Sequence, residues 1–414
     1  MLDYLIIGAG VTGITLSKFL RKGGIDNILV LEKEDRPGGL CKTEIINGHT
    51  LDIGGGHFFH TKHQEIFDYI FSFLPKEEFN YFERVSKIKI GDVTIDYPIE
   101  SNIWQMPIND QIEYLISVVR NGEALGMGEP SNYEEWIRWK LGNKICDEYM
   151  IPYNEKLWGV SPSEMDIDWL YKIPRVNVDE VLRYCLERKQ DVTKFPAHIH
   201  FYYPKKGGFE SLVSAIAKDE MKYIKLNEAV TKMDYVRDHW VINDTYEAKN
   251  VINTTPWNDL YDALGRPHEI ESDITKIRYN RIVVSLYEHD YEHGWHWRYV
   301  PDSALAHHRE FYIGNFAKDS KPNGIYLETG IKRFDEKSAG FEGVKPVANY
   351  TTDAAYPIPV VGHTQAIRNI LKYYEPMHLF GCGRWGQHEY QNADVSMHEA
   401  VKFAQNLVLQ EERG

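Results

Sequence analysis

The segment of residues 3–39 constrains the fold of this chain more than any other part of the sequence. It begins with a short apolar strand, continues through glycines spaced as GxGxxG, and passes into a helix whose apolar residues recur at helical spacing. The glycines are Gly8, Gly10 and Gly13, and a second apolar strand ends at Glu32. Such glycines let the backbone approach a pyrophosphate at a helix N-terminus, while the acid accepts hydrogen bonds from ribose hydroxyls. The order of these features predicts a Rossmann-like α/β domain that binds a dinucleotide, rather than a glycine turn that serves packing alone.

A second glycine turn lies within residues 33–40, and it distinguishes between cofactors. Its arginine and two glycines resemble the extended FAD fingerprint of glutathione-reductase-like and amine-oxidase-like flavoproteins, so we expect FAD rather than NAD. Consecutive glycines at residues 54–56 then suit a backbone that lies against a flat ring, although a bulged strand end gives the same pattern. The cofactor-binding candidates in the two turns are Arg36, Gly38, Gly39, Gly55 and Gly56.

The periodicity of the remaining sequence divides the chain into parts. Amphipathic helical patterns over residues 96–191 indicate an inserted helical lobe. Alternating patterns over residues 266–349 indicate a separate antiparallel sheet, which we expect to carry substrate contacts. Residues 1–95, 192–265 and 350–414 would then form one discontinuous FAD-binding domain. The fold class predicted is α/β, with a helical lobe and a separate sheet added to the Rossmann-like domain.

Composition limits the partners and the compartment. A formal net charge of −14 offers no basic face for nucleic acid, and no run of apolar residues is long enough to predict a membrane span. The apolar start is broken by glycines and reads as a strand rather than a secretory leader. The cysteines form no CxxC pair and no cluster with histidines at metal-ligand spacing, so we expect free thiols in the cytoplasm and no bound metal.

Four separated motifs then give the chain a more specific resemblance. They are "GGHFFHT" at 55–61, "YNEKLWGVSPSEM" at 153–165 with the following "KIPRV", "YPIP" at 356–359, and "FGCGRWG" to "MHEA" at 380–400. In this order, and over nearly the whole length, they resemble the motifs of the UDP-galactopyranose mutase family. We therefore expect a mutase of that type.

The resemblance implies a reaction and its partners. The reaction is the pyranose to furanose ring contraction of a nucleotide sugar, in which N5 of reduced FAD attacks the anomeric carbon with no net redox change. Expected partners are a nucleotide-diphosphate sugar, a reductant such as NAD(P)H and a second copy in a homodimer, and the product of such enzymes serves cell-surface polysaccharide synthesis. An oxidase or desaturase of the amine-oxidase-like group is the alternative, since it shares the fingerprint but needs no arginine aimed at a diphosphate.

The resemblance also implies which residues form the site. Arg309 is the first candidate for the diphosphate, followed by Arg175 and Arg298, and for each the alternative is a structural or surface ion pair. His57 matches the residue beside the flavin N5, where its backbone can matter more than its imidazole. The other expected contacts are Tyr153, Trp158 and Tyr356 with the substrate, and Arg384, Asp394 and Met397 with the flavin.

Residues 153–159, "YNEKLWG", leave two interpretations open. A proline before and a glycine after them bracket a short helix, and large aromatics on such a helix most often fill core. A flat ring with a polar edge can also line a nucleotide site, which is what the family position of Tyr153 and Trp158 favours. The two charged residues between them, Glu155 and Lys156, are expected to form a structural salt bridge.

Overall fold

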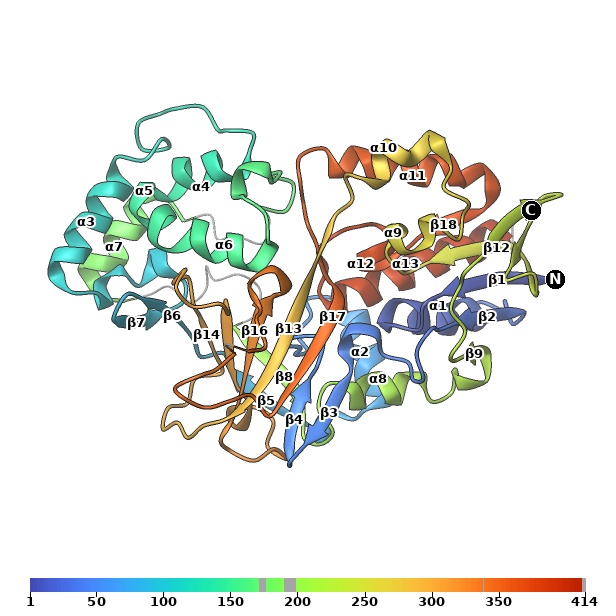
Figure 1. Ribbon diagram of the computed structural model, residues 1–414, viewed down its shortest axis with the longest axis horizontal. Coiled ribbons are helices and arrows are strands. Elements are labelled where there is room, and N and C mark those ends of the chain that lie inside the picture. The colour runs from blue at the N-terminus through green and yellow to red at the C-terminus, as the bar shows by residue number, and fades with distance from the viewer. Residues whose placement is uncertain (171–175, 190–198, 338, 412–414) are drawn as a thin grey trace.

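The computed structural model describes residues 1–170, 176–189, 199–337 and 339–411. Figure 1 shows a helical lobe at one end of the molecule and the part that carries both chain termini at the other, with a long sheet below and between them. The helical lobe and the terminal part are therefore connected mainly through this sheet.

The first sheet has a parallel core at the amino terminus. β1 (Leu2–Ile7) pairs in parallel with β12 (Tyr246–Asn253) on one side and with β2 (Ile28–Leu31) on the other. The sheet is completed by β9 (Ile224–Lys225), β10 (Met233–Val236), β11 (His239–Ile242) and β18 (Leu379–Gly381). The apolar runs of β1 and β2 are what strands need when helices cover both faces of a parallel sheet.

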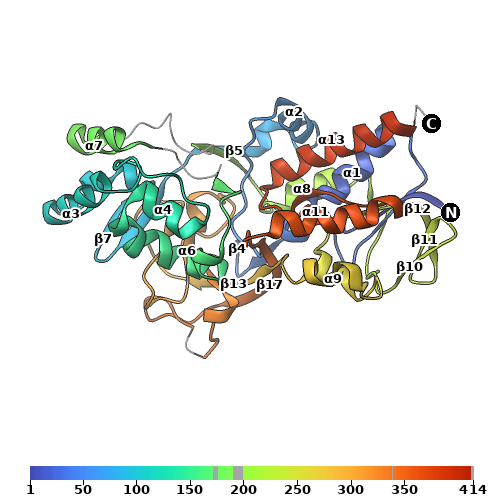
Figure 2. The same ribbon diagram turned by 90° about the horizontal axis from the view of Figure 1, so that it is seen from above.

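Helices cover both faces of this sheet, and β1 shows how its residues divide between them. Ile6 packs into one buried cluster with α1 (Val11–Lys22) and α13 (Ala393–Glu411), whereas Leu5 and Ile7 pack into another cluster. The helices of that other face are α9 (Trp257–Tyr261), α10 (Glu271–Ile274) and α11 (His363–Tyr374). Helices α1 and α13 pack against each other (Figure 2). The period of two along a strand accounts for the division.

The second sheet is long and mostly antiparallel. Its order is β17 (Ala348–Pro357), β13 (Tyr279–Glu288), β16 (Gly324–Gly330), β15 (Arg309–Tyr312), β14 (Trp297–Tyr299), β6 (Ser86–Ile90) and β7 (Val93–Asp96). One pair, β14 with β6, is parallel. The limits drawn from the sequence place residues 86–95 with the cofactor-binding part, whereas the structure pairs them with this sheet, because a short alternating strand does not show which sheet it joins.

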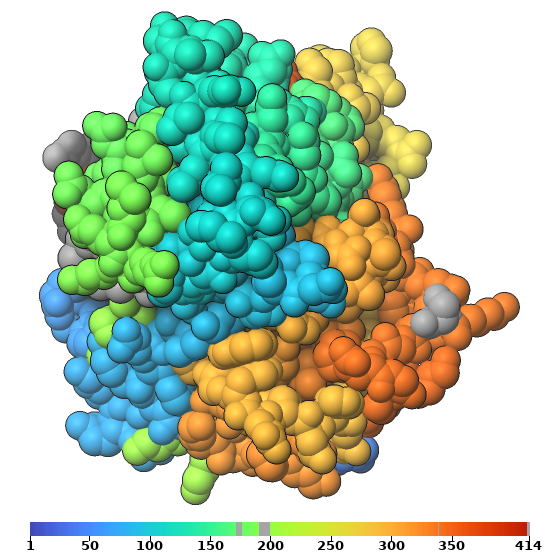
Figure 3. Space-filling view, turned by 90° about the vertical axis from the view of Figure 1, so that its left-hand side faces the viewer, coloured from blue at the N-terminus to red at the C-terminus, as the bar shows by residue number. Residues whose placement is uncertain are grey.

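The helical lobe stands on one end of the second sheet. Its helices are α3 (Ile108–Val119), α4 (Tyr133–Leu141), α5 (Asn143–Ile145), α6 (Ile151–Trp158) and α7 (Val178–Glu187). Figure 3 shows the teal surface of the lobe above blue and orange surface that belongs to earlier and later parts of the chain. α6 ends at Gly159 in a left-handed conformation, as the sequence predicted, but it begins at Ile151 and continues directly from the helical turn Cys146–Met150, so Pro152 lies within its first turn rather than starting the helix.

Short elements connect the two sheets. They are β3 (Thr43–Ile46) with β4 (His49–Asp52), β5 (Phe79–Glu83) with β8 (His200–Pro204), and the helices α2 (Gln64–Phe73), α8 (Glu210–Ala217) and α12 (Gly383–Gly386). The turn after β4 and helix α12 bring Gly54, His57 and Arg384 to one cavity. Among the helices of the described residues, none has the length and apolar character needed to cross a membrane.

Candidate active site

A cavity of about 660 Å³ runs along the carboxyl edge of the parallel strands. At one end it is lined by the first glycine turn and by Glu32, and at the other by His57 and Arg384. The expected cofactor-binding residues that line it are Gly8, Gly10, Glu32, Gly38, Gly39 and Arg384. Ligands of open α/β sheets bind at this edge, where the N-terminus of α1 also points. The cavity is therefore the candidate dinucleotide site.

The Glu32 carboxylate is buried and fixes the two turns beside this cavity. Its Oε2 accepts from the backbone N–H of Ala9 at 2.7 Å, and its Oε1 accepts from that of Glu34 at 3.0 Å. The acid that ends β2 thus orders the glycine turn as well as facing the expected ribose position.

Other expected cofactor contacts lie behind the cavity wall. Arg36 is held by ion pairs to Glu44 and Glu210 at 2.5 and 2.9 Å. The expected residues outside the lining are Gly13, Arg36, Gly55, Gly56, Asp394 and Met397. These residues shape neighbouring turns and helices, and their roles toward a cofactor stay predictions.

Gly13 has a steric role that leads to a testable prediction. A Cβ atom at this position would lie 1.9 Å from the carbonyl oxygen of Gly8, which is backbone and cannot move aside cheaply. We expect Gly13→Ala to displace the glycine turn, to lose most of the bound flavin and to destabilise the fold by roughly 1–3 kcal/mol. Flavin absorbance per protein and the midpoint of thermal unfolding measure both effects. The matched control is Gly128→Ala, where the added Cβ meets nothing within 4 Å.

Arg384 provides a test of whether the cavity suits an anionic or electron-rich cofactor. Its guanidinium is buried, and within the described part of the chain its Nε and Nη2 have no hydrogen-bond partner. The guanidinium carbon lies 5.1 Å from the ring centroids of both Tyr356 and Tyr390. Burial lowers the pKa of Arg384. Burying a hydrogen-bond donor without a partner costs free energy. A group with acceptor atoms, such as a flavin or its diphosphate, would satisfy these Arg384 donors and therefore fits this end of the cavity.

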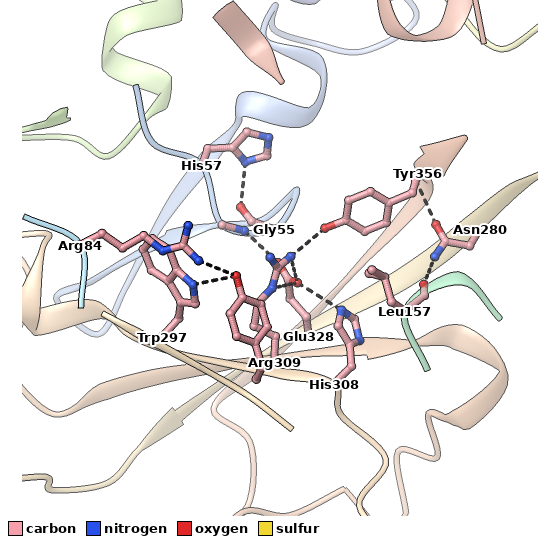
Figure 4. Close-up of polar contacts among 12 residues, drawn as sticks. Gly55, His57, Arg84, Leu157, Asn280, Trp297, His308, Arg309, Glu328 and Tyr356 are labelled. Atoms are coloured by element: carbon pink, nitrogen blue, oxygen red, sulfur yellow. Dashed lines mark hydrogen bonds and ion pairs between the residues drawn. The ribbon is translucent and has the colours of Figure 1, made fainter. Parts of the chain in front are cut away.

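Arg309 lies next to this cavity in a network of charged and aromatic side chains (Figure 4). Its Nε donates to Oε2 of Glu328 at 2.8 Å, and its Nη2 donates to the same oxygen and to the hydroxyl of Tyr356 at 2.9 Å. Arg309 and Glu328 are directly opposite on neighbouring strands, so their side chains leave the sheet on the same face. The sheet thus presents a fixed arginine and a tyrosine hydroxyl side by side.

Glu328 joins this network to the turn beside the cofactor cavity. Its Oε1 accepts from the backbone N–H of Gly56 at 2.9 Å, and His308 Nε2 lies 3.4 Å from its Oε2. Burial alone would raise the pKa of Glu328, but Arg309 and His308 outweigh it and lower the pKa to about 2. An ionised carboxylate therefore fixes Arg309 relative to the Gly56 turn.

His57 lies at the opposite side of this site and is neutral near pH 7. Its Nδ1 is 2.8 Å from the carbonyl oxygen of Gly55, which can only accept, so Nδ1 carries the proton. Burial lowers the pKa of His57 to about 4. The side chain is thus fixed by its own turn, and the role of its backbone toward a flavin stays a prediction.

The aromatics of α6 are buried and face the network. Trp158 is 1% exposed, its indole N–H donates to Oδ1 of Asn154 at 2.9 Å, and its ring lies 6.0 Å from that of Tyr356. Tyr153 lies 5.4 Å from the ring of Tyr299, which is opposite Arg309 on the neighbouring strand. Tyr153 and Trp158 therefore fill the core and also form a wall beside Arg309 and Tyr356.

The expected salt bridge within α6 is wrong. Lys156 is buried and its Nζ donates to the carbonyl oxygens of Val300 and Asp302, both at 2.7 Å, while Glu155 is exposed. Adjacent residues on a helix point about 100° apart, so the two side chains leave in different directions. Lys156 instead fastens α6 to the loop after β14.

The structure also separates the three candidate arginines. Arg298 makes a bidentate pair with Glu310 at 2.8 and 3.0 Å, one residue along from Arg309 on the neighbouring strand. Because side chains alternate along a strand, Arg298 and Glu310 leave the sheet on the face opposite to Arg309. Arg298 therefore points away from the Arg309 network, its contact with substrate stays a prediction, and Arg175 lies outside the described residues.

Besides Glu328 and His308, the residues Tyr390, Arg84 and Tyr299 belong to the site but were not predicted from the sequence. Tyr390 lies 5.5 Å from the ring of Tyr356 and 5.6 Å from that of Trp158. Arg84 donates from Nη2 to the hydroxyl of Tyr299 at 3.0 Å, and its guanidinium lies 4.9 Å from the ring of Trp297. Tyr299 could have been predicted by pairing the two alternating segments that carry it and Arg309, because it lies directly opposite Arg309. No local pattern marks Tyr390 or Arg84.

Comparisons with known proteins place this geometry among known folds. Residues 6–72 match the family model described as an NAD(P)-binding Rossmann-like domain. A probable UDP-galactopyranose mutase from Klebsiella pneumoniae is 21% identical over 98% of this chain and 94% of the relative. A UDP-galactopyranose mutase from Mycoplasma genitalium is 27% identical over 52% of this chain and 51% of the relative.

Solved structures give the same picture for the fold. A crystal structure of reduced UDP-galactopyranose mutase superposes with a TM-score of 0.87 at 21% identity, covering 99% of this chain and 94% of that one. A putative protoporphyrinogen oxidase from Exiguobacterium superposes with a TM-score of 0.75 at 14% identity, covering 99% of both chains. The second structure shows that the fold alone is shared more widely.

The fold defines an α/β protein in which a helical lobe and a second sheet are added to a Rossmann-like domain that matches a family model of NAD(P)-binding domains. Within that class, the chain resembles UDP-galactopyranose mutases over nearly its whole length in sequence and in fold. The resemblance and the fold class predicted from the motifs are thereby confirmed. The expected enzyme class, an isomerase of this type, agrees with both sets of relatives.

Proposed function

We propose that this protein is an FAD-dependent mutase that interconverts the pyranose and furanose forms of a nucleotide sugar of the UDP-galactose type. The observation that carries the proposal is the fixed Arg309 and Tyr356 pair, which Glu328 ties to the Gly56 turn beside the cofactor cavity. A cation and a hydroxyl donor at that place suit a diphosphate leaving group next to a flavin.

Different side chains would bind the substrate, exclude water and position the flavin edge. Arg309 and Tyr356 bind the diphosphate and stabilise the charge that develops on it as it leaves. The aromatics Tyr153 and Trp158 form the wall toward the nucleotide and exclude water from the arginine. Neutral His57 positions the turn at the flavin edge without adding a charge there. Arg175 is kept as a second candidate for the diphosphate.

FAD would occupy the cavity of about 660 Å³, with its pyrophosphate at the glycine turn and Arg384 toward its ring system. In its reduced form, which a reductant such as NAD(P)H would supply, FAD provides a nucleophilic nitrogen for the anomeric carbon. The compartment proposed is the cytoplasm, because all of the cysteines are free and buried. The product would enter cell-surface polysaccharide synthesis.

The substrate is tested with a panel of nucleotide sugars. Dithionite-reduced protein is incubated with UDP-galactose, UDP-N-acetylgalactosamine or a nucleotide-linked deoxyhexose, and pyranose and furanose forms are separated by chromatography. Furanose product from at least one sugar is expected with reduced protein and none with oxidised protein. A purified protein without a flavin spectrum, or one that yields no furanose from any sugar when reduced, would overturn the proposal.

A homodimer through the helical lobe is part of the proposal. Helix α3, at the outer edge of that lobe, leaves Ile108, Ile112, Ile116 and Val119 between 39% and 66% exposed on one face (Figure 2). An apolar stripe of this kind matches a copy of itself across a two-fold axis. We expect Ile112→Glu combined with Ile116→Glu to yield monomers in sedimentation, whereas the control Val236→Glu stays dimeric. A monomeric wild-type protein would contradict the dimer.

A further inference from the structure

A second crevice lies between the C-terminal end of α6, the start of β13 and the short 3-10 helix η12 (Ile331–Arg333). Its volume is about 400 Å³, and it shares no lining residue with the cofactor cavity. It also lacks Arg309, Tyr356 and His57 among its walls. Apart from Trp158, which belongs to both, this crevice is separate from the candidate active site, and its binding chemistry does not depend on the proposed mutase function.

The crevice is basic in a chain whose formal charge is −14. Its lining contains Lys156, Arg278, Arg281, Lys332 and Arg333, against the single carboxylate of Glu155. The Lys156 ammonium is engaged by backbone carbonyls, which leaves the other side chains to face the crevice. Positive charge gathered in a concave surface focuses a field that attracts anions.

The four facing cations are only weakly neutralised by the protein. Arg278 pairs with Glu164 and Arg281 with Asp353, but both carboxylates are more than half exposed, where such pairs contribute little. Lys332 donates to the carbonyl oxygen of Gly159 at 2.9 Å, and Arg333 to a backbone carbonyl of the loop after β14. Neither makes an ion pair with any carboxylate of the described residues. Their charge matches a dianion.

Two further features indicate what accompanies the anion. The amide of Asn258 lies in the crevice wall; its Nδ2 donates to a backbone carbonyl at 3.1 Å, whereas its buried Oδ1 has no hydrogen-bond donor among the described residues. A ligand hydroxyl would supply that donor. Tyr279 adds an aromatic wall of the kind that packs against sugar rings. The volume lies at the small end of the range of ligand sites.

From this combination we propose that the crevice between α6, β13 and η12 binds the phosphate ester of a small sugar. Lys332 and Arg333 hold the phosphate dianion, Arg278 and Arg281 enlarge the positive field, and Asn258 accepts from a sugar hydroxyl. Binding of a phosphate dianion by such side chains is charge-assisted and bidentate at arginine.

The crevice is connected to the active site through the end of α6. Asn280 donates from its amide to the carbonyl oxygen of Leu157, and its Oδ1 accepts from the backbone N–H of Tyr356 at 3.0 Å. Trp158 belongs to the crevice wall and also contacts the Tyr356 ring. An occupant that draws Lys332 away from Gly159 changes the restraint on the helix that carries Trp158, so occupancy would alter the affinity of the active site for its nucleotide.

Calorimetric titration of the flavin-loaded protein with glucose 1-phosphate, inorganic phosphate and glucose tests the site. We expect glucose 1-phosphate to bind more tightly than phosphate, and glucose not to bind. Lys332→Ala combined with Arg333→Ala should weaken binding of glucose 1-phosphate roughly tenfold or more, and Asn258→Ala should remove its advantage over phosphate. The control pair Lys249→Ala and Arg266→Ala, which are exposed elsewhere, should not change it.

The active-site variant Arg309→Ala separates this site from the other one. It should retain glucose 1-phosphate binding, whereas loss in Arg309→Ala with full binding in the Lys332 and Arg333 double variant would place the ligand in the active site and overturn the proposal. Absence of binding to the wild-type protein would overturn it as well. Flavin content and the unfolding midpoint, measured on each variant, identify any loss that comes from misfolding.

Discussion

Arg309→Ala will lower kcat for furanose and pyranose interconversion by roughly 10²- to 10³-fold while the flavin stays bound. The guanidinium is 16% exposed and fixed by Glu328 and Tyr356, so it acts as a preorganised cation toward a departing diphosphate. It does not line the cofactor cavity, which is why flavin retention is expected. The measurements are kcat of the reduced protein and the flavin absorbance per protein.

Two companion variants make the Arg309 result specific. Arg309→Lys keeps one charge but cannot bond Glu328 and Tyr356 from a planar fork, so its kcat should fall between those of the wild type and Arg309→Ala. Arg266→Ala removes a solvent-exposed arginine from a loop and should leave kcat unchanged. A wild-type kcat in Arg309→Ala would show that the diphosphate is bound elsewhere, with Arg175 as the next candidate.

Glu328→Ala will destabilise the protein by about 3–5 kcal/mol, the usual cost of removing one partner of a buried ion pair. The carboxylate is fully buried, so its loss leaves the Arg309 charge uncompensated and the Gly56 N–H without an acceptor. Glu328→Gln keeps an acceptor for Gly56 but not the charge, and should cost less. Urea unfolding measures the free energy of unfolding, with exposed Glu292→Ala as the control expected near the wild-type value.

The same ion pair predicts a pH dependence of stability. The pKa of Glu328 is lowered to about 2 in the folded protein from an ordinary value of 4.5. Its contribution is therefore fully present above about pH 4.5 and is lost as the pH falls toward 2. The difference in unfolding free energy between wild type and Glu328→Gln should shrink over that interval. A difference that stays constant down to pH 3 would contradict an ionised Glu328.

The cofactor-binding half of the fold could be predicted because its signals are local. Strand, glycine turn, helix, strand and acid occur within residues 3–39, and backbone sterics at Gly13 and hydrogen bonding at Glu32 act over the same short range. The end of α6 at Gly159 could be predicted for the same reason, because a glycine adopts the left-handed conformation without distant partners, and Pro152 fits the first turn of the helix on the same local grounds.

The substrate side could be predicted less well because it depends on sheet register. Arg298 and Arg309 looked alike in sequence, but register and alternation send them to opposite faces. Glu328 joins the site only because its strand, β16, pairs with β15 in a register that puts it opposite Arg309. Tyr390 comes from a turn after β18 and reaches Tyr356 through tertiary packing. Lys156 bonds to carbonyls of a distant loop rather than to its neighbour. None of these contacts has a local sequence signal.

Turnover without consumption of the reduced flavin is the most direct test of a mutase. Dithionite-reduced protein, freed of excess reductant under anaerobic conditions, is mixed with UDP-galactofuranose while flavin absorbance and UDP-galactopyranose are followed together. We predict many molecules of product per flavin, with the absorbance staying at that of the reduced form. Product formed only in step with flavin oxidation, or no product at all, would contradict the proposed function.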